Sequence, residues 1–245
     1  MQWKTAITNI EDGKERIRGY ALEELMQKKS FSEVIFLLLK GELPTEKQAK
    51  MFSAILTSVI DHGPAVASAM NARISASAKN DLHTSVAAGL LGLGGRHGVV
   101  IEPAMKFFYD HVKNADLLGH LKTMKEQKKF APGYGHKIFT TDPRTQTLFA
   151  LAKKLKIYGD YCAFAEKAEE TLNAISSKKL PLNADGAIAA ILCDMRFDAR
   201  VGNGIFVIAR VPGLVAHVVE EVMNDEGIRR AEDVEYTGVA ERDVE

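Results

Sequence analysis

Apolar residues in this chain recur at intervals of three and four, and Gly or Pro separates one such stretch from the next. Phe52, Ile55 and Val59, for example, have the spacing of a single helix face. No stretch alternates apolar and polar residues over the length that a strand in a sheet requires. The sequence therefore predicts an all-α protein without a sheet, with about a dozen helices at the usual helix length.

Some helix ends carry their own signals. Ser30 and Glu33 have the spacing of a capping box before the apolar run 34–39, and Gly41 is suited to end that helix. Residues 1–19, by contrast, are mixed and polar, and the Asp12-Gly13 pair among them indicates an irregular arm or a short hairpin.

Charge and hydropathy disfavour several classes of protein. The 245 residues include 32 Lys and Arg against 32 Asp and Glu, so no net charge favours nucleic acid or a membrane surface as a partner. Apolar runs such as 34–39 are too short to cross a membrane, and the first residues lack the apolar segment of a secretory signal. Two cysteines, Cys162 and Cys193, make neither a disulfide framework nor a zinc site. We therefore expect a cytoplasmic protein that holds no metal and binds neither nucleic acid nor membrane.

One loop combines residues that bind and polarise small anions. Its sequence is Ala131-Pro132-Gly133-Tyr134-Gly135-His136-Lys137, and Asp142-Pro143-Arg144 follows shortly after. Two Gly beside an aromatic residue let bare backbone approach a ligand, a His can hold a carbonyl oxygen, and an Arg can clamp a carboxylate. The alternative is an exposed turn between helices with a surface His, and the residues alone leave both interpretations open.

Three histidines, His62, His97 and His136, stand beside glycines at breaks in the helical pattern. A single His at a helix end usually just meets the last carbonyls, but three at such breaks suggest a functional site. Metal ligation is the weaker interpretation, because no HxxxH or HExxH motif occurs and no Cys lies at ligand spacing.

Asp185 precedes Gly186 and an apolar helix. That position fits a helix N-cap, and it equally fits a general base whose pKa is set by burial at the mouth of the helix. The sequence alone does not decide between these two roles.

Two further patterns are less specific. The Gly-rich segment 89–98 lacks GxGxxG and follows a helix rather than a strand, which disfavours dinucleotide binding. A lysine-rich stretch before the loop either meets the phosphates of an anionic cofactor or forms an ordinary solvated face. Its members are Lys122, Lys125, Lys128 and Lys129, with Lys137 in the loop itself.

Taken in chain order, these motifs resemble the citrate synthase family, and in particular its short branch of citryl-CoA lyases and C-terminal modules of ATP-citrate lyases. The resemblance covers nearly the whole chain, and five motifs in the right order are far more specific than any one. They are Gly95-Arg96-His97-Gly98, Pro132-Gly133-Tyr134-Gly135-His136, Asp142-Pro143-Arg144, Asn183-Ala184-Asp185-Gly186, and Ala209-Arg210 followed by Gly213, Ala216 and His217. One departure is Gly95-Arg96, where citrate synthases usually have Pro-Leu.

The resemblance implies a role for most of these residues. His97 is expected to stabilise the enol of acetyl-CoA, His136 to polarise the oxaloacetate carbonyl, and Asp185 to exchange the proton of the thioester methyl group. A second set is expected to bind the substrate carboxylates: His62, Arg144 and Arg210, with Arg229 or Arg230 supplied by the tail of a partner subunit. A third set is expected to receive coenzyme A: Gly133, Tyr134, Gly135 and Lys137.

The resemblance also implies an architecture and a reaction. The family has a large and a small helical domain with the active site in the cleft, and it works as a homodimer or a higher homo-oligomer. Here the large domain would combine residues 1–104 with 197–245, and the small domain would span 105–196. The expected activity is that of a citryl-CoA lyase, a retro-Claisen cleavage of citryl-CoA to acetyl-CoA and oxaloacetate. A short citrate or 2-methylcitrate synthase, and an inactive homologue serving as a partner subunit, stay open as alternatives.

Overall fold

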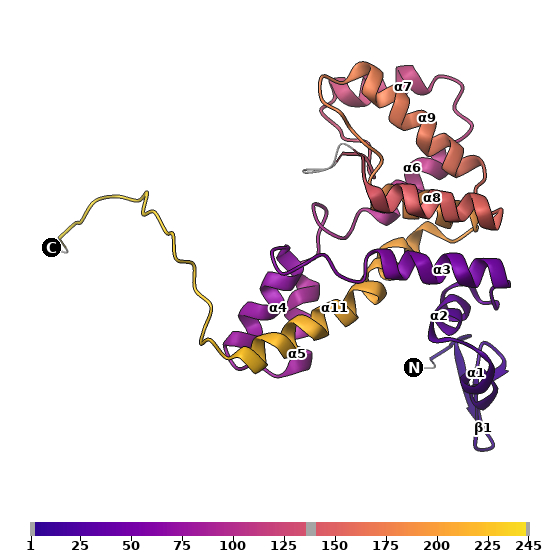
Figure 1. The fold of residues 1–245 in the computed structure, drawn as a ribbon, viewed down its shortest axis with the longest axis horizontal. Helices are drawn as coiled ribbons and strands as arrows, with labels where there is room; N and C mark the ends of the chain where they lie inside the picture. The colour runs from indigo at the N-terminus through magenta and orange to yellow at the C-terminus, as the bar shows by residue number, and fades with distance from the viewer. Residues whose placement is uncertain (1–2, 136–140, 244–245) are drawn as a thin grey trace. The chain divides into compact units, whose positions relative to one another are not determined.

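The computed structural model describes residues 3–135 and 141–243 (Figure 1). Within them lie eleven α-helices, one 3-10 helix and three short strands, so the predicted helical fold class is confirmed. Two compact units divide the chain: unit 1 combines Met1–His62 with Leu93–Gly213, and unit 2 combines Gly63–Gly92 with Leu214–Glu245. This division differs from the large and small domains expected above, whose boundaries stay a prediction.

A small antiparallel sheet lies near the N-terminus of unit 1. Its strands are β1 (Thr8–Glu11), β2 (Lys14–Ile17) and β3 (Tyr20–Ala21), in that spatial order. Asp12 and Gly13 both have positive φ at the hairpin turn between the first two strands, which suits a two-residue turn. The hairpin was one of two expectations for this segment, but the expectation of no sheet was wrong. Strands of two to four residues are too short to display an alternating pattern.

Helices α1 (Leu22–Lys28), α2 (Phe31–Lys40) and α3 (Glu46–Ser58) follow the sheet. The ends of α2 confirm the predicted signals, because Ser30 forms a capping box at its start and Gly41 ends it with a φ of 90°. Apolar side chains of α2 and α3 then join the core of unit 1.

The core of unit 1 is built around α10 (Ala184–Asp194), in which every residue from 186 to 193 is buried. Its alanines let α6 (Ile101–His111), α8 (Pro143–Leu155) and α9 (Asp160–Ile175) approach closely. Unit 1 is completed by α7 (Leu117–Glu126), by the 3-10 helix η1 (Ala199–Val201), and by the first part of α11 (Gly202–Asn224). Because α10 is enclosed on several sides, the residues at its N-terminus are held firmly against the core.

Helix α11 runs through Pro212 without a break. The apolar spacing of residues 204–219 predicts a helix that is interrupted at Arg210 and Pro212, and the expected interruption was wrong. Proline removes one backbone hydrogen bond, but buried residues on both sides, among them Ala209 and Leu214, keep the helix packed. No helix among residues 3–135 and 141–243 is long and apolar enough to cross a membrane.

Unit 2 consists of α4 (Ala67–Ser77), α5 (Leu82–Leu91), the end of α11 and the tail. Its helices pack as closely as their small residues suggest. A Cβ on Gly89 would lie only 2.9 Å from the carbonyl oxygen of Ser68. Such close contact explains why this pair of helices is rich in Ala and Ser and has Gly at position 89.

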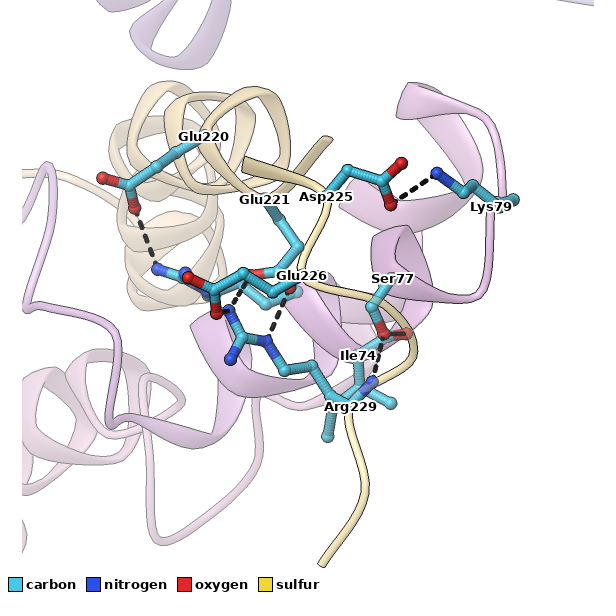
Figure 2. Close-up of polar contacts among 9 residues, drawn as sticks. Ile74, Ser77, Lys79, Glu220, Glu221, Asp225, Glu226 and Arg229 are labelled. Carbon is cyan, nitrogen blue, oxygen red and sulfur yellow. Dashed lines mark hydrogen bonds and ion pairs between the residues drawn. The ribbon is translucent and has the colours of Figure 1, made fainter. Parts of the chain in front are cut away.

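One buried carboxylate ties the tail to unit 2 (Figure 2). The Glu221 side chain on α11 is 1% exposed and pairs with Arg73 at 2.7 Å and with Arg229 at 2.6 Å. The Arg229 N–H also donates to Ser77 Oγ at 2.9 Å. Hydrogen bonds from Arg229, and then from Arg73, hold the pKa of Glu221 below its usual value despite burial. The tail is therefore anchored as far as Arg229.

Candidate active site

The glycine-rich loop pairs with the segment that leads into α10. The Gly135 N–H donates to the Pro181 carbonyl at 2.7 Å. The Asn183 N–H donates to the Gly133 carbonyl at 3.0 Å. Gly133 and Gly135 have φ of 87° and 94°, a conformation that favours glycine at both positions. The shaped loop predicted from the sequence is therefore present and is held against the start of α10. Its last two predicted site residues, His136 and Lys137, lie outside the described residues.

Tyr134 anchors this loop to a second helix. Its hydroxyl donates to the Ala165 carbonyl of α9 at 3.1 Å, and its ring packs edge-on against Phe108. Burial raises the pKa of the Tyr134 hydroxyl well above its usual value. The Tyr134 hydroxyl is thus bonded to α9, and only the other atoms of the residue can contact a ligand.

Most of the groups predicted to act on a substrate line one cavity of about 150 Å³, all of it within unit 1. They are His62, His97, Arg144, Asp185 and Arg210. These residues come from well-separated parts of the sequence, so the fold brings together what the motifs only ordered along the chain.

Arg144 is held by Asp142, a residue to which the sequence assigned no role of its own. The Arg144 Nε and Nη2 atoms donate to the two carboxylate oxygens of Asp142 at 3.1 and 2.8 Å. Asp142 is fully buried and also accepts from the Ala184 N–H at 3.1 Å. Burial alone would raise the pKa of Asp142, but the Arg144 hydrogen bonds and charge, with the Ala184 amide, hold it below its usual value. One carboxylate therefore fixes both Arg144 and the first turn of α10.

Arg210 carries a second guanidinium into the cavity. Its Nε donates to the Val59 carbonyl at 3.0 Å, and its charge lies 4.8 Å from the centre of the Phe206 ring. Its Nη1 atom is buried and has no hydrogen-bond partner among the described residues. Burial lowers the Arg210 pKa, and the carboxylates of Asp61 and Asp185 oppose that effect. A buried guanidinium nitrogen without a partner is suited to meet a bound anion.

His97 lies in a tight turn, where it exchanges two backbone hydrogen bonds of 2.8 Å with Gly94. The next residue, Gly98, has a φ of 79°, and a Cβ there would lie 2.7 Å from the Phe206 ring. Burial lowers the pKa of His97, as does electrostatic repulsion from Arg210 and from His62. A lowered pKa favours the neutral ring, which can still donate an N–H hydrogen bond.

Asp185 occupies the first turn of α10, but the helix is capped by Asn183, whose side chain accepts from the Gly186 N–H. The N-cap interpretation of Asp185 was therefore wrong. Burial raises the pKa of its carboxyl, Arg144 and Arg210 oppose that rise, and the charge of Asp142 adds to it. A cavity carboxyl with a raised pKa keeps a proton more readily than a free carboxyl and is suited to donate and accept protons.

Together these groups favour one kind of chemistry. Arg144 and Arg210 suit a substrate with two carboxylates, and Asp185 can move a proton. A neutral His97 can donate to an oxygen that becomes negative during the reaction. The cavity is therefore suited to proton transfer at a carbon beside a carbonyl group in an anionic substrate.

A second cavity in unit 1, of about 250 Å³, lies between α7 and α9. Its floor is apolar, and its lining includes Ala131 and Tyr134 of the glycine-rich loop. Four lysines also line it: Lys125, Lys128, Lys129 and Lys178. Three of them belong to the lysine-rich stretch noted in the sequence, whereas Lys122 is not part of the lining. Cations around an apolar pocket suit a ligand that has both phosphates and an aromatic base.

The two candidate tail arginines differ in their surroundings. Arg229 is paired with Glu221 and, at 3.1 Å, with Glu226 of its own chain. Arg230 is exposed and makes no hydrogen bond or ion pair within the described part of the chain. Within that same part, no group of three or more His, Cys, Asp or Glu side chains is placed to hold a metal ion.

Comparison with known proteins gives a consistent family. Residues 2–59 and 46–232 match the family model described as citrate synthase, C-terminal domain. The probable ATP-citrate synthase of Dictyostelium discoideum is 30% identical over 239 residues, which cover 89% of this chain but only 38% of that protein. The chain therefore spans well under half the length of this curated relative.

Two solved structures are similar over almost the entire chain. The structure of citryl-CoA lyase from Hydrogenobacter thermophilus is 46% identical, with a TM-score of 0.93 and coverage of 99% of this chain and 97% of that one. The structure of ATP citrate lyase from Methanothrix soehngenii in complex with citrate and coenzyme A is 27% identical, with a TM-score of 0.86. It covers 98% of this chain and 42% of that chain.

Proposed function

Because the chain belongs to the citrate synthase family, we propose that it is a citryl-CoA lyase, which cleaves citryl-CoA to acetyl-CoA and oxaloacetate. The observation that carries the proposal is the cavity in which two arginines face a carboxyl of raised pKa. The 46% identity to a citryl-CoA lyase, over nearly the full length of both chains, supports cleavage as the reaction.

The cavity residues divide the chemistry among them. Arg144 and Arg210 bind carboxylates of the citryl group and so fix the carbon–carbon bond that breaks. The tertiary hydroxyl passes its proton to His136, its oxygen becomes the oxaloacetate carbonyl, and the electrons of the breaking carbon–carbon bond form the enolate of acetyl-CoA. The enolate oxygen accepts a hydrogen bond from His97, and Asp185, in its protonated form, delivers a proton to the enolate carbon.

The remaining site assignments are part of the same proposal. His136 polarises the carbonyl of oxaloacetate, and His62 contributes to the binding of the carboxylates. The glycine-rich loop, with Lys137, receives coenzyme A. The coenzyme phosphates meet the lysines of the second cavity, and the adenine lies on its apolar floor. A relative whose structure contains citrate and coenzyme A supports both ligands.

We place the final cation at Arg230 of a partner subunit, since Arg229 is already committed to Glu221. The protein is therefore proposed to act as a homodimer. A reducing cytoplasm suits its two cysteines, which are both buried and unpaired. The cleft between the two predicted domains would hold the complete site.

Product analysis tests the reaction directly. Purified protein is incubated with citryl-CoA, and separately with acetyl-CoA or propionyl-CoA plus oxaloacetate. We expect oxaloacetate and acetyl-CoA from the first mixture. Release of the coenzyme A thiol only in the second mixture would identify a citrate or 2-methylcitrate synthase. Turnover in neither would favour the inactive homologue.

An Asp185→Asn variant tests the assigned proton donor, because Asn cannot carry the proton. We expect kcat to fall by about 10²–10⁴-fold, the usual effect of losing a general acid or base. Asp198→Asn is the matched control, since Asp198 lies on the surface and outside the cavity lining. An Asp185→Asn enzyme with more than about a tenth of the wild-type kcat would remove Asp185 from this role.

A further inference from the structure

Asn183 uses both ends of its side chain where the glycine-rich loop meets α10. Its Oδ1 accepts from the Gly186 N–H at 3.0 Å, which caps the helix. Its Nδ2 donates to the Gly135 carbonyl at 3.0 Å. Ser or Asp would supply the cap as well as Asn does. The second bond requires Asn, because an Asp carboxylate has no proton to donate and a Ser side chain is too short to reach both groups.

The two segments that Asn183 joins are in direct backbone contact. A Cβ on Gly186 would lie 2.4 Å from the Gly133 carbonyl oxygen. A Cβ on Gly133 would lie 2.7 Å from the Gly186 Cα atom. With this clearance, the loop cannot slide along the start of α10 without breaking the Asn183 side-chain bonds, together with the two backbone hydrogen bonds that join the segments.

We infer that Asn183 is a positioning residue, which sets the register between the loop and Asp185 by tying the Gly135 carbonyl to the first turn of α10. In the sequence, His136 directly follows Gly135, and Asp185 stands two residues after Asn183. The effect of Asn183 on the rate rests on the proposed function, which assigns His136 and Asp185 to the two carbons of one breaking bond. The effect of Asn183 on the position of the loop does not depend on any reaction. A misplacement of about 1 Å can cost on the order of 100-fold in rate.

Asn183→Ser is the informative variant, because a serine hydroxyl still caps α10 but no longer reaches Gly135. Asn203→Ser is its matched control. Asn203 on α11 also uses both ends of its amide, accepting from the Glu102 N–H at 3.0 Å and donating to the Glu102 carboxylate at 3.2 Å. The two differ in that Asn183 belongs to the lining of the 150 Å³ cavity, whereas Asn203 lies outside it.

Amide hydrogen exchange measures the register without reference to any reaction. In Asn183→Ser we expect exchange in residues 131–135 to rise by about two- to tenfold, the change that one net hydrogen bond supports. Asn203→Ser should leave this segment as in the wild type. Unchanged exchange in Asn183→Ser would overturn the inference, even if the protein turns out to catalyse another reaction.

A double-mutant cycle on citryl-CoA turnover then tests the effect on the chemistry. Asn183→Ser should lower kcat by about 10- to 100-fold in the wild-type background, with a melting temperature close to that of Asn203→Ser. In the Asp185→Asn background the same substitution should cost little more, because there is no carboxyl left to position. Equal losses in both backgrounds, or an equal loss in Asn203→Ser, would reduce Asn183 to a stabilising residue. A wild-type protein that does not cleave citryl-CoA at all would instead refute the proposed function.

Discussion

Replacing Asp142 by Asn should destabilise unit 1 much more than the same change at a comparable surface pair. The Asp142 carboxylate is 0% exposed and receives hydrogen bonds from Arg144 and Ala184. An amide keeps one acceptor oxygen but turns an NH₂ group toward these donors, so at least one of them loses its partner. Breaking a buried ion pair costs about 3–5 kcal/mol.

The cost at Asp142 is reduced because the Arg144 side chain is 27% exposed and remains partly solvated. We therefore expect a loss of about 2–3 kcal/mol in the free energy of unfolding. With roughly 2–4 °C lost per kcal/mol for a chain of this size, the melting temperature should fall by roughly 4–12 °C. Thermal unfolding followed by circular dichroism measures this change.

Asp198 and Arg200 provide the control. This pair has the same spacing in the sequence and the same two kinds of bond, from the Arg backbone N–H and from the guanidinium. It is exposed, with 82% of the Arg200 side chain and 49% of the Asp198 side chain accessible, so water screens it. Asp198→Asn should leave the melting temperature almost unchanged. Similar losses in Asp142→Asn and Asp198→Asn would refute the argument that burial makes Asp142 important.

The stability difference should also depend on pH with a definite sign. The pKa of Asp142 is lowered in the folded protein, so its carboxylate stabilises the fold above the unfolded value of about 3.9. That contribution is lost as the pH falls through the lowered, folded pKa. Wild type and Asp142→Asn should therefore differ most near pH 7 and converge below about pH 4.

The same substitution should move the pH profile of the reaction. The negative charge of Asp142 helps to raise the pKa of Asp185, and removing it also leaves the Arg144 charge uncompensated. Both changes lower the Asp185 pKa. The limb of the kcat/KM profile that reports Asp185 should move to lower pH in Asp142→Asn and stay in place in Asp198→Asn.

Four further outcomes follow from the structure. Asp185→Asn should raise the melting temperature at neutral pH, because burial raises the folded pKa of this carboxyl; the gain should vanish below the unfolded value of about 3.9. Gly186→Ala should destabilise by about 1–3 kcal/mol, since its Cβ would lie 2.4 Å from a backbone oxygen, whereas Gly204→Ala, with open space in α11, should stabilise by up to about 1 kcal/mol in chemical denaturation. Light scattering at micromolar concentration should give a dimer that forms through the small-residue helices of 65–91, and an active monomer would contradict this. Calorimetric titration should show that coenzyme A binds more tightly when oxaloacetate is present, and that this difference is lost in Arg144→Ala. The same coenzyme A affinity with and without oxaloacetate in the wild type would argue against coupling between the two ligands, and so would a difference in Arg144→Ala as large as in the wild type.

Much of the fold could be predicted because helix packing and helix capping produce local patterns in the sequence. Ser30 begins α2 with a capping box and Gly41 ends it, both as predicted. The small sheet produced no such pattern, because its strands are too short to alternate. Pro212 misled the prediction because the packing that keeps α11 continuous comes from residues distant in the sequence.

The candidate site could be predicted where the residue types themselves indicate the kind of chemistry. His97, Arg144 and Asp185 are conspicuous in a sequence, and they share a cavity in the structure. The second roles of Asn183 and Asp142 could not be predicted, because a helix-capping residue has the same pattern in the sequence whatever its other side-chain atoms contact. Only the fold shows that the free end of each side chain reaches another part of the site.

The buried Glu221 sets a limit on how much of the C-terminus can be removed. A chain cut before Arg229 would leave this carboxylate with Arg73 as its single partner and would deprive Ser77 Oγ of its backbone donor. A cut after Arg230 would leave both contacts in place. Limited proteolysis should therefore trim the tail back toward residue 230 and slow markedly there. Substitutions, insertions or deletions beyond residue 230 should therefore leave the stability of unit 2 unchanged. They would be limited only by the surface that this part of the tail contacts.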